Sequence, residues 1–146
     1  MSPQVPNDGA LPTLLTSDVS RAGPITDLQR LTVSLRGGVE SGASHLLFSF
    51  TGQLDAYSDK QFNEFIAGYQ GDGTLPLVID LSRIDFIDSS GLGALVQLAK
   101  QCKEAGSQFL VVGNARVVQT VKLVRLEEFL HLQPDLDTAL GRLSAA

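Results

Sequence analysis

Cysteine, basic residues and long apolar runs are all scarce in this chain of 146 residues. The single cysteine, Cys102, excludes an intrachain disulfide framework and fits a reducing compartment. No apolar run approaches the ~20 residues that span a bilayer. The N-terminus has no basic start followed by a hydrophobic core, so we expect no signal peptide, no membrane contact and a cytoplasmic protein. The net charge of −5 and the scattered 11 basic residues argue against direct nucleic-acid binding.

Motifs that carry catalysis or hold a cofactor are also missing. No Gly-x-Ser-x-Gly elbow surrounds Ser89, because Ile87 stands two residues before it. No glycine-rich loop ends in Gly-Lys-Ser/Thr, so the usual phosphate cradle is absent. One cysteine and two separated histidines argue against a zinc site, and three acids lack the spacing of a divalent-cation cage: Asp80, Asp85 and Asp88. We therefore expect no enzyme, no metal and no cofactor.

The first part of the chain differs from the rest in composition. Residues 1–28 hold four of the six prolines among small polar residues, and they show no hydrophobic period. This predicts a poorly ordered N-terminal tail over 1–28 and a single folded domain over 29–146.

Hydrophobic periods predict strands and helices in alternation along the folded domain. The predicted strands cover 31–35, 45–50, 75–81, 109–112 and 128–132, with His131 inside the last. The predicted helices cover 56–69, 89–102, 114–124 and 134–143. The glycine-rich segment 37–42 is typical of a loop, so the first two strands form an antiparallel hairpin. The remaining alternation indicates an α/β fold: a mixed, mostly parallel sheet of about five strands with about four helices.

A short polar segment joins the buried strand 75–81 to the helix after it. Asp88, Ser89 and Ser90 stand at the start of that helix, followed by Gly91 and Gly93. A helix N-terminus has unpaired N–H groups and a positive dipole end, so a serine there is a plausible place for a phosphate. Asp88 or Ser89 equally suits a plain N-cap. Spacing alone leaves both roles open.

Two motifs give the chain a family resemblance. Gly52-Gln53-Leu54-Asp55, and then the run from Leu77 to Gly93 with its Asp-Ser-Ser-Gly-Leu core, resemble the STAS domain, and more narrowly the bacterial anti-sigma factor antagonists. The resemblance covers about residues 31–143. It implies a small sheet with helices packed on it and a phosphoacceptor serine directly after the aspartate, which is Ser89. Gln53 departs from the family pattern, in which glutamate is usual.

The resemblance implies a partner switch in transcription regulation. The unmodified protein binds an anti-sigma factor that is also a serine kinase, phosphorylation releases it, and a serine phosphatase resets the switch. A phosphate adds about −1.5 to −2 charges beside Asp85 and Asp88, which would repel the partner. The implied partner-binding residues are Asp55, Asp88, Ser89, Ser90 and Gly93, flanked by Gln97, Lys100 and Gln101.

Two other functions stay open. The chain could be a STAS binding subunit of a lipid-transport or transporter-associated complex, which needs no phosphorylatable serine. It could also be a nucleotide-binding STAS module, although the missing phosphate loop argues against that. A homodimer stays open as well.

Overall fold

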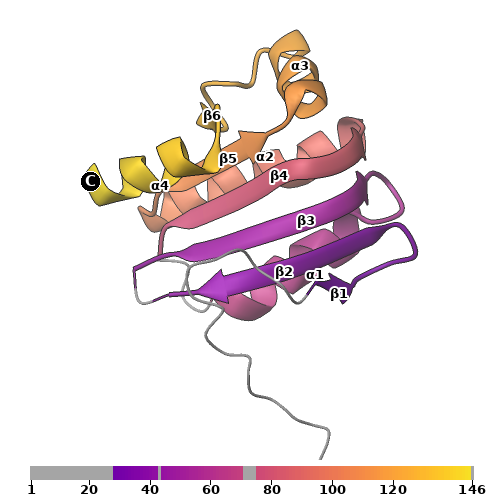
Figure 1. Ribbon diagram of the computed structural model, residues 1–146, viewed down its shortest axis with the longest axis horizontal. Helices are drawn as coiled ribbons and strands as arrows, with labels where there is room; N and C mark the ends of the chain where they lie inside the picture. The colour runs from indigo at the N-terminus through magenta and orange to yellow at the C-terminus, as the bar shows by residue number, and fades with distance from the viewer. Residues whose placement is uncertain (1–27, 43, 71–74, 146) are drawn as a thin grey trace, which may run out of the picture.

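A computed structural model of the chain describes residues 28–42, 44–70 and 75–145, which form one sheet with helices on both faces (Figure 1). The strands are β1 (Gln29–Arg30), β2 (Leu35–Ser41), β3 (Leu46–Leu54), β4 (Leu77–Ile87), β5 (Phe109–Gly113) and β6 (Leu132–Gln133). The helices are α1 (Asp59–Gln70), α2 (Ser89–Ala105), α3 (Ala115–Leu123) and α4 (Leu136–Ala145). The predicted tail lies outside the described residues except for Leu28. No helix within these ranges is long and apolar enough to cross a membrane.

The six strands lie in the sheet in the order of the sequence. The pairs β1–β2 and β2–β3 are antiparallel, and the pairs from β3 to β6 are parallel. Each connection between neighbouring parallel strands contains a helix, because the chain must run back along the sheet before the next parallel strand can begin. The predicted α/β fold with an N-terminal antiparallel hairpin is confirmed. The sheet has six strands because the short strand β1 precedes the predicted hairpin.

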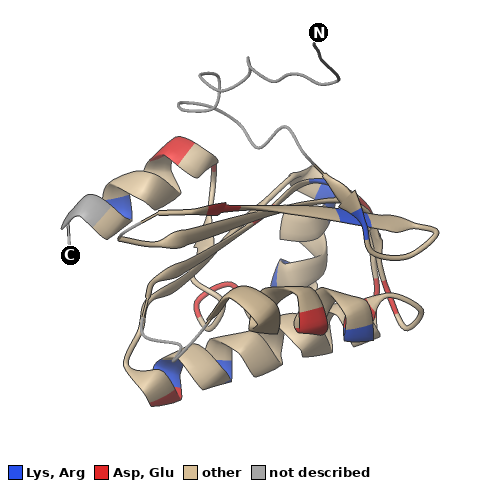
Figure 2. Cartoon of the chain, turned by 90° about the horizontal axis from the view of Figure 1, so that it is seen from below, with Lys and Arg blue, Asp and Glu red and all other residues tan. Residues whose placement is uncertain are grey.

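The sheet separates two apolar layers of unequal size. Helices α1, α2 and α3 pack on one face around Phe48, Phe50 and Leu95, whereas α4 covers part of the other face over Val78 (Figure 2). Strand β4 therefore has buried side chains on both faces, which explains its unbroken apolar run. Strand β4 lies between β3 and β5, so its C-terminal end is central among the strand ends on that side of the sheet.

The first predicted strand is wrong in position. Residues 31–34 form a bend, and β2 begins only at Leu35, so the supposed loop glycines Gly37 and Gly38 lie inside a strand. The hairpin turn comes after Ser41 instead. A Cβ on Gly37 would lie 2.8 Å from the ring of Phe50 on β3. The glycine thus makes room for a core aromatic ring and does not mark a turn.

The C-terminal region also differs from the prediction. Residues 127–131 form a turn, and the strand comes after it as β6, because His131 adopts a left-handed backbone with φ 52° that no strand accommodates. The predicted helices α3 and α4 are confirmed. Val124, the last residue of the predicted helix 114–124, is exposed because it follows the last residue of α3.

Candidate functional site

Strands β3 and β4 end next to each other at one edge of the sheet, on the right in Figure 1. Leu54 and Ile87 are register partners of this parallel pair, and the N–H of Asp88 donates to the carbonyl of Leu54 at 3.3 Å. The residues that follow the two strands, Asp55 and Asp88, therefore come to the same end of the sheet. Ser89 opens α2 beside them.

Asp88 is the N-cap of α2. Its Oδ1 accepts hydrogen bonds from the N–H groups of Ser90 at 2.9 Å and Gly91 at 3.1 Å. Its backbone is extended, with φ −118° and ψ −169°, as an N-cap residue requires. The Ser89 hydroxyl has no hydrogen-bond partner among the described residues, and Ser89 is exposed whereas Ser90 is half-buried. Capping therefore falls to Asp88 alone, and Ser89 presents a free hydroxyl to solvent.

Glycine is needed for steric reasons at position 91 but not at position 93. A Cβ on Gly91 would collide with the carbonyl oxygen of Leu54 and lie 2.9 Å from its Cγ, so glycine allows α2 to start against the end of β3. A Cβ on Gly93 would meet nothing within 4 Å. A glycine in an exposed helix interior lowers the stability of the helix by about 1 kcal/mol relative to alanine. No contact in the described chain explains why position 93 is a glycine. Gly93 stands four residues after Ser89, so both lie on one exposed helix face.

Asp55 does not present its carboxylate at the surface. The residue is 8% exposed, and its carboxylate accepts hydrogen bonds from the N–H of Tyr57 at 3.0 Å and the hydroxyl of Ser58 at 3.2 Å. The Ser58 Oγ also lies 2.8 Å from the carbonyl oxygen of Gln53, so its single hydrogen is shared between this carbonyl and the Asp55 carboxylate. Asp55 therefore holds the turn between β3 and α1 in shape.

Exposed apolar side chains surround this edge, and the sequence patterns missed them. Val33 is 94% exposed, Tyr57 86% and Phe86 45%. Val33 belongs to the bend whose Ser34 carbonyl accepts from the N–H of Gln53 at 2.9 Å, and Phe86 is the register partner of Gln53. We call Val33, Tyr57 and Phe86 the apolar rim. Grouped exposed apolar residues mark interaction surfaces; Tyr57, an aromatic residue in a turn, was the available sequence signal.

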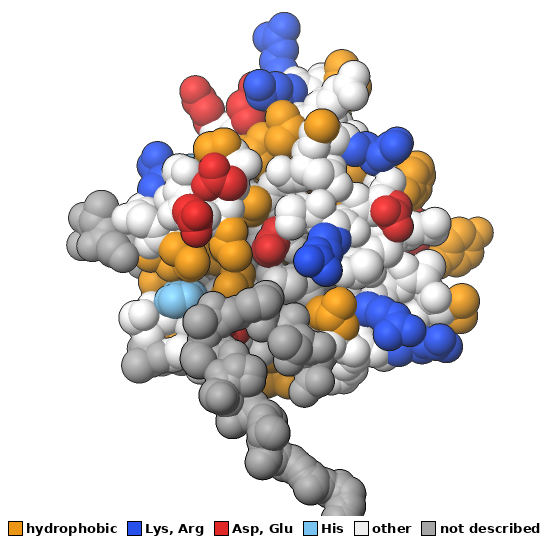
Figure 3. Space-filling model, in the orientation of Figure 1, with side chains coloured by type: hydrophobic (Ala, Val, Ile, Leu, Met, Phe, Trp, Pro, Cys, Tyr) orange, Lys and Arg blue, Asp and Glu red, His pale blue; other side chains and the backbone are white. Residues whose placement is uncertain are grey.

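The charges around Ser89 are negative close by and mixed farther away. Asp85 is exposed and Asp88 half-buried, whereas the predicted flank of Gln97, Lys100 and Gln101 is exposed on α2. On the opposite side of the sheet, Lys and Arg alternate with Asp, Glu and neutral side chains (Figure 3). The described side chains visible on that face form no continuous basic patch of the kind a phosphate backbone requires.

Neither histidine lies near Ser89. His45 immediately precedes β3, so it stands at the opposite edge of the sheet from the end of β4. The Nδ1 of His131 lies 2.9 Å from the carbonyl oxygen of Phe109, which begins β5 at that same opposite edge. Ser89 therefore has no imidazole base to activate it as a nucleophile.

The described ranges contain no candidate metal site, and their one cysteine is buried. They contain no group of three or more His, Cys, Asp or Glu residues that could hold a metal ion. Cys102 is buried in the core, and this burial raises the pKa of its thiol, while a hydrogen bond from Ser107 lowers it to a smaller extent. The thiol is therefore neutral and packed at pH 7.

Comparison with known proteins shows one family. The model of the STAS domain family matches residues 38–139. A candidate anti-anti-sigma factor of Mycobacterium tuberculosis is 26% identical over 117 residues, covering 77% of this chain and 78% of that protein. An anti-sigma-B factor antagonist of Listeria monocytogenes is 25% identical over 95 residues, covering 64% and 83%. The crystal structure of an anti-sigma factor antagonist from Mycobacterium paratuberculosis has a TM-score of 0.70 and 27% identity, covering 76% and 95%.

Proposed function

The chain belongs to the STAS domain family, and from this premise we propose that it is an anti-sigma factor antagonist controlled by phosphorylation of Ser89. With Ser89 unmodified, the protein binds an anti-sigma factor that is also a serine kinase. With Ser89 phosphorylated, it releases that partner, and a serine phosphatase restores binding. The role is one of binding in the cytoplasm, without catalysis or a cofactor in this chain. Relatives that bear the name of this role support it.

The proposal rests on the different roles of two neighbouring residues: Asp88 caps α2, and Ser89 is left exposed for modification. A serine that caps a helix has its hydroxyl engaged with the backbone. Here Asp88 makes both capping hydrogen bonds, and the Ser89 hydroxyl is free and exposed. A kinase can therefore modify Ser89 without removing the cap of α2, so the switch acts on the surface and leaves the fold intact.

A phosphate on Ser89 would keep most of its charge toward a partner. The N–H groups of Ser90 and Gly91, which would otherwise hold an anion at the helix start, already donate to Asp88. Asp85 and Asp88 add further negative charge nearby. The added −1.5 to −2 charges thus meet no free cation among these residues, so an approaching partner must desolvate them or be repelled.

The apolar rim supplies the affinity that phosphorylation would cancel. Burying one large apolar side chain contributes about 1.5–3 kcal/mol, so Val33, Tyr57 and Phe86 together offer several kcal/mol to a partner. An uncompensated charge buried at the same interface costs several kcal/mol as well. Because the two magnitudes are similar, one phosphate is enough to tip the balance.

Phosphosite mapping tests the proposal. The protein is used to capture its partner from native cells, and the captured kinase is incubated with ATP and either the wild type, Ser89→Ala or Ser90→Ala. We expect phosphate on the wild type and on Ser90→Ala but not on Ser89→Ala. Phosphate only on Ser90 would overturn the assignment of the site. Capture of subunits of a transport ATPase in place of a kinase would favour the transport-complex alternative.

A further inference from the structure

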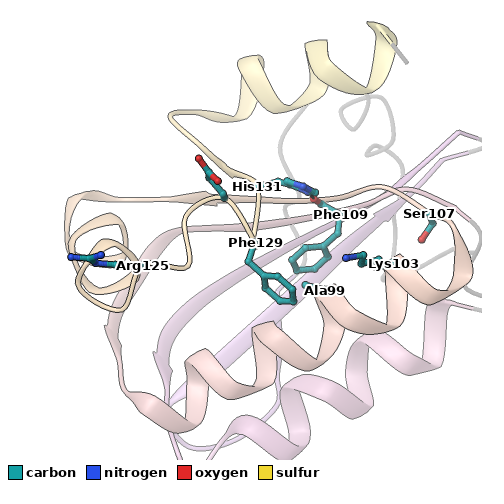
Figure 4. Close-up of a pocket in the computed structure, with 8 residues that line it drawn as sticks. Ala99, Lys103, Ser107, Phe109, Arg125, Phe129 and His131 are labelled. Carbon is teal, nitrogen blue, oxygen red and sulfur yellow. Dashed lines mark hydrogen bonds between the residues drawn. The ribbon is translucent and has the colours of Figure 1, made fainter.

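A hollow lies along the second half of α2, away from Ser89. Its volume is about 560 Å³, and helix α2, the start of β5 and the segment 124–131 enclose it (Figure 4). It is lined by Ala99, Lys103, Ser107, Phe109, Arg125, Glu128, Phe129 and His131. Ala99 stands ten residues after Ser89 on α2, which is about 15 Å along the helix axis. The hollow is therefore separate from the switch surface.

Two lining residues have a backbone conformation that usually belongs to glycine. Arg125 has φ 59° and His131 has φ 52°, and these are the non-glycine residues with positive φ in the described chain. In each case the N–H donates to the carbonyl three residues earlier, and the next N–H donates to the carbonyl five residues earlier. This pair of hydrogen bonds closes a helical turn and requires a left-handed residue.

The end of α2 shows what the same turn looks like with the usual residue. Gly106 has φ 74° and makes the same two hydrogen bonds with its neighbour. A residue with a Cβ is less stable than glycine in this conformation. The two corresponding turns nevertheless have Arg125 and His131 at this position, and both residues line the same hollow. Unfavourable backbone conformations cluster at binding sites, where the side chain can contact a ligand and glycine cannot.

The lining combines an apolar floor with positive charge. Phe109 and Ala99 are buried, and Phe129 is 38% exposed. Figure 4 shows the rings of Phe109 and Phe129 between Lys103 on one side and Arg125 on the other. Glu128 is the one acid among the lining residues, against these two cations.

His131 adds a polar group of defined orientation. Its Nδ1 lies 2.9 Å from the carbonyl oxygen of Phe109, and a carbonyl can only accept, so Nδ1 carries the hydrogen. The other ring nitrogen, Nε2, has no hydrogen-bond partner among the described residues and is available to a bound molecule. The backbone therefore fixes the ring that borders the hollow.

We propose that this hollow binds a small organic acid whose carboxylate lies beside Lys103 and whose apolar body lies over Phe109 and Phe129. The volume is in the range of small-molecule sites, which are mostly apolar with a few oriented polar groups. A neutral apolar molecule would leave the cations unused, and a small inorganic anion would leave the rings uncovered. This binding goes beyond the switch at Ser89 and does not depend on it.

Nuclear magnetic resonance with the full chain tests the site. Octanoate is titrated into the ¹⁵N-labelled protein, with octanamide and acetate as probes that lack the charge or the apolar body. We expect saturable shifts at the amides of Lys103, Phe109, Phe129 and His131 with octanoate, and at least fivefold weaker binding of the other two probes. Equal binding of octanoate and octanamide would overturn the proposal, as would shifts confined to the apolar rim.

Substitutions separate binding from folding. Lys103→Gln should weaken octanoate binding about fivefold, whereas Lys100→Gln, an exposed position of α2 outside the hollow, should leave it unchanged. Arg125→Gly should raise the melting temperature, because glycine suits the left-handed backbone, and it should leave octanoate affinity unchanged, because Arg125 lies at the opposite end of the hollow from Lys103. Unchanged octanoate affinity in Lys103→Gln, or an equal loss in Lys100→Gln, would refute the assignment.

Discussion

Gly93 offers the sharpest separation of stability from partner binding. It lies in the interior of α2, exposed, with open space where a Cβ would be. Replacement of such a glycine by alanine or glutamine removes a helix penalty of about 0.8–1 kcal/mol. For a domain of this size the gain corresponds to a rise in melting temperature of about 3 °C. The structure therefore predicts that Gly93→Gln is more stable than the wild type.

The same substitution should impair binding of the anti-sigma partner. The new side chain would stand on the exposed helix face that also carries Ser89, and a partner that approaches the bare backbone there would meet it. Overpacking of a fitted contact costs about 1–3 kcal/mol, which is a loss in affinity of about fivefold to 150-fold. Isothermal titration calorimetry with the proposed anti-sigma partner measures this loss, and thermal unfolding measures the gain in stability.

Gly141→Gln is the matched control for Gly93→Gln. Gly141 is also an exposed interior glycine of a helix, α4, and a Cβ there would likewise meet nothing within 4 Å. It should raise the melting temperature by a similar amount and leave partner affinity unchanged. Wild-type affinity in Gly93→Gln would refute the idea that the partner covers this helix face. A fall in melting temperature would contradict the open space above Gly93.

Further predictions concern the switch, the apolar rim and the support of β4. Ser89→Asp should weaken partner binding by about 1–3 kcal/mol while Ser89→Ala keeps it; equal affinities of both in calorimetry would contradict the switch. Tyr57→Ala should weaken binding by about 1–2 kcal/mol without a change in melting temperature, since the side chain is 86% exposed; undiminished affinity would remove Tyr57 from the docking surface. Asn114 caps α3 by accepting from the N–H of Val117, and its amide donates to the carbonyls of Ser82 and Ile84 at 3.2 and 2.7 Å. Asn114→Asp keeps the cap and loses both donors, so it should lower the free energy of unfolding by about 1–3 kcal/mol in urea titration; wild-type stability would show that these bonds do not support β4.

The sequence alone determined the elements whose signals are local. The cap at Asp88 acts on N–H groups two and three residues away, and Gly106 ends α2 through its own backbone angle. The apolar stripe of a helix and the unbroken run of β4 also follow from neighbours in the chain. For this reason the helices, the parallel order and the position of Ser89 at a helix start could all be predicted. The family motif lies within the same short stretch.

Tertiary structure decided everything that depends on contact between distant segments. The glycines of β2 look like a loop until the ring of Phe50 is seen against Gly37. Asp55 stays a predicted partner-binding residue, but only the folded turn before α1 shows that it is mostly buried and bonded to Tyr57 and Ser58. The apolar rim and the hollow beside α2 each join segments that are far apart in the chain. No local period encodes such neighbours, because strand register and the close approach of backbones arise only when the whole sheet is assembled.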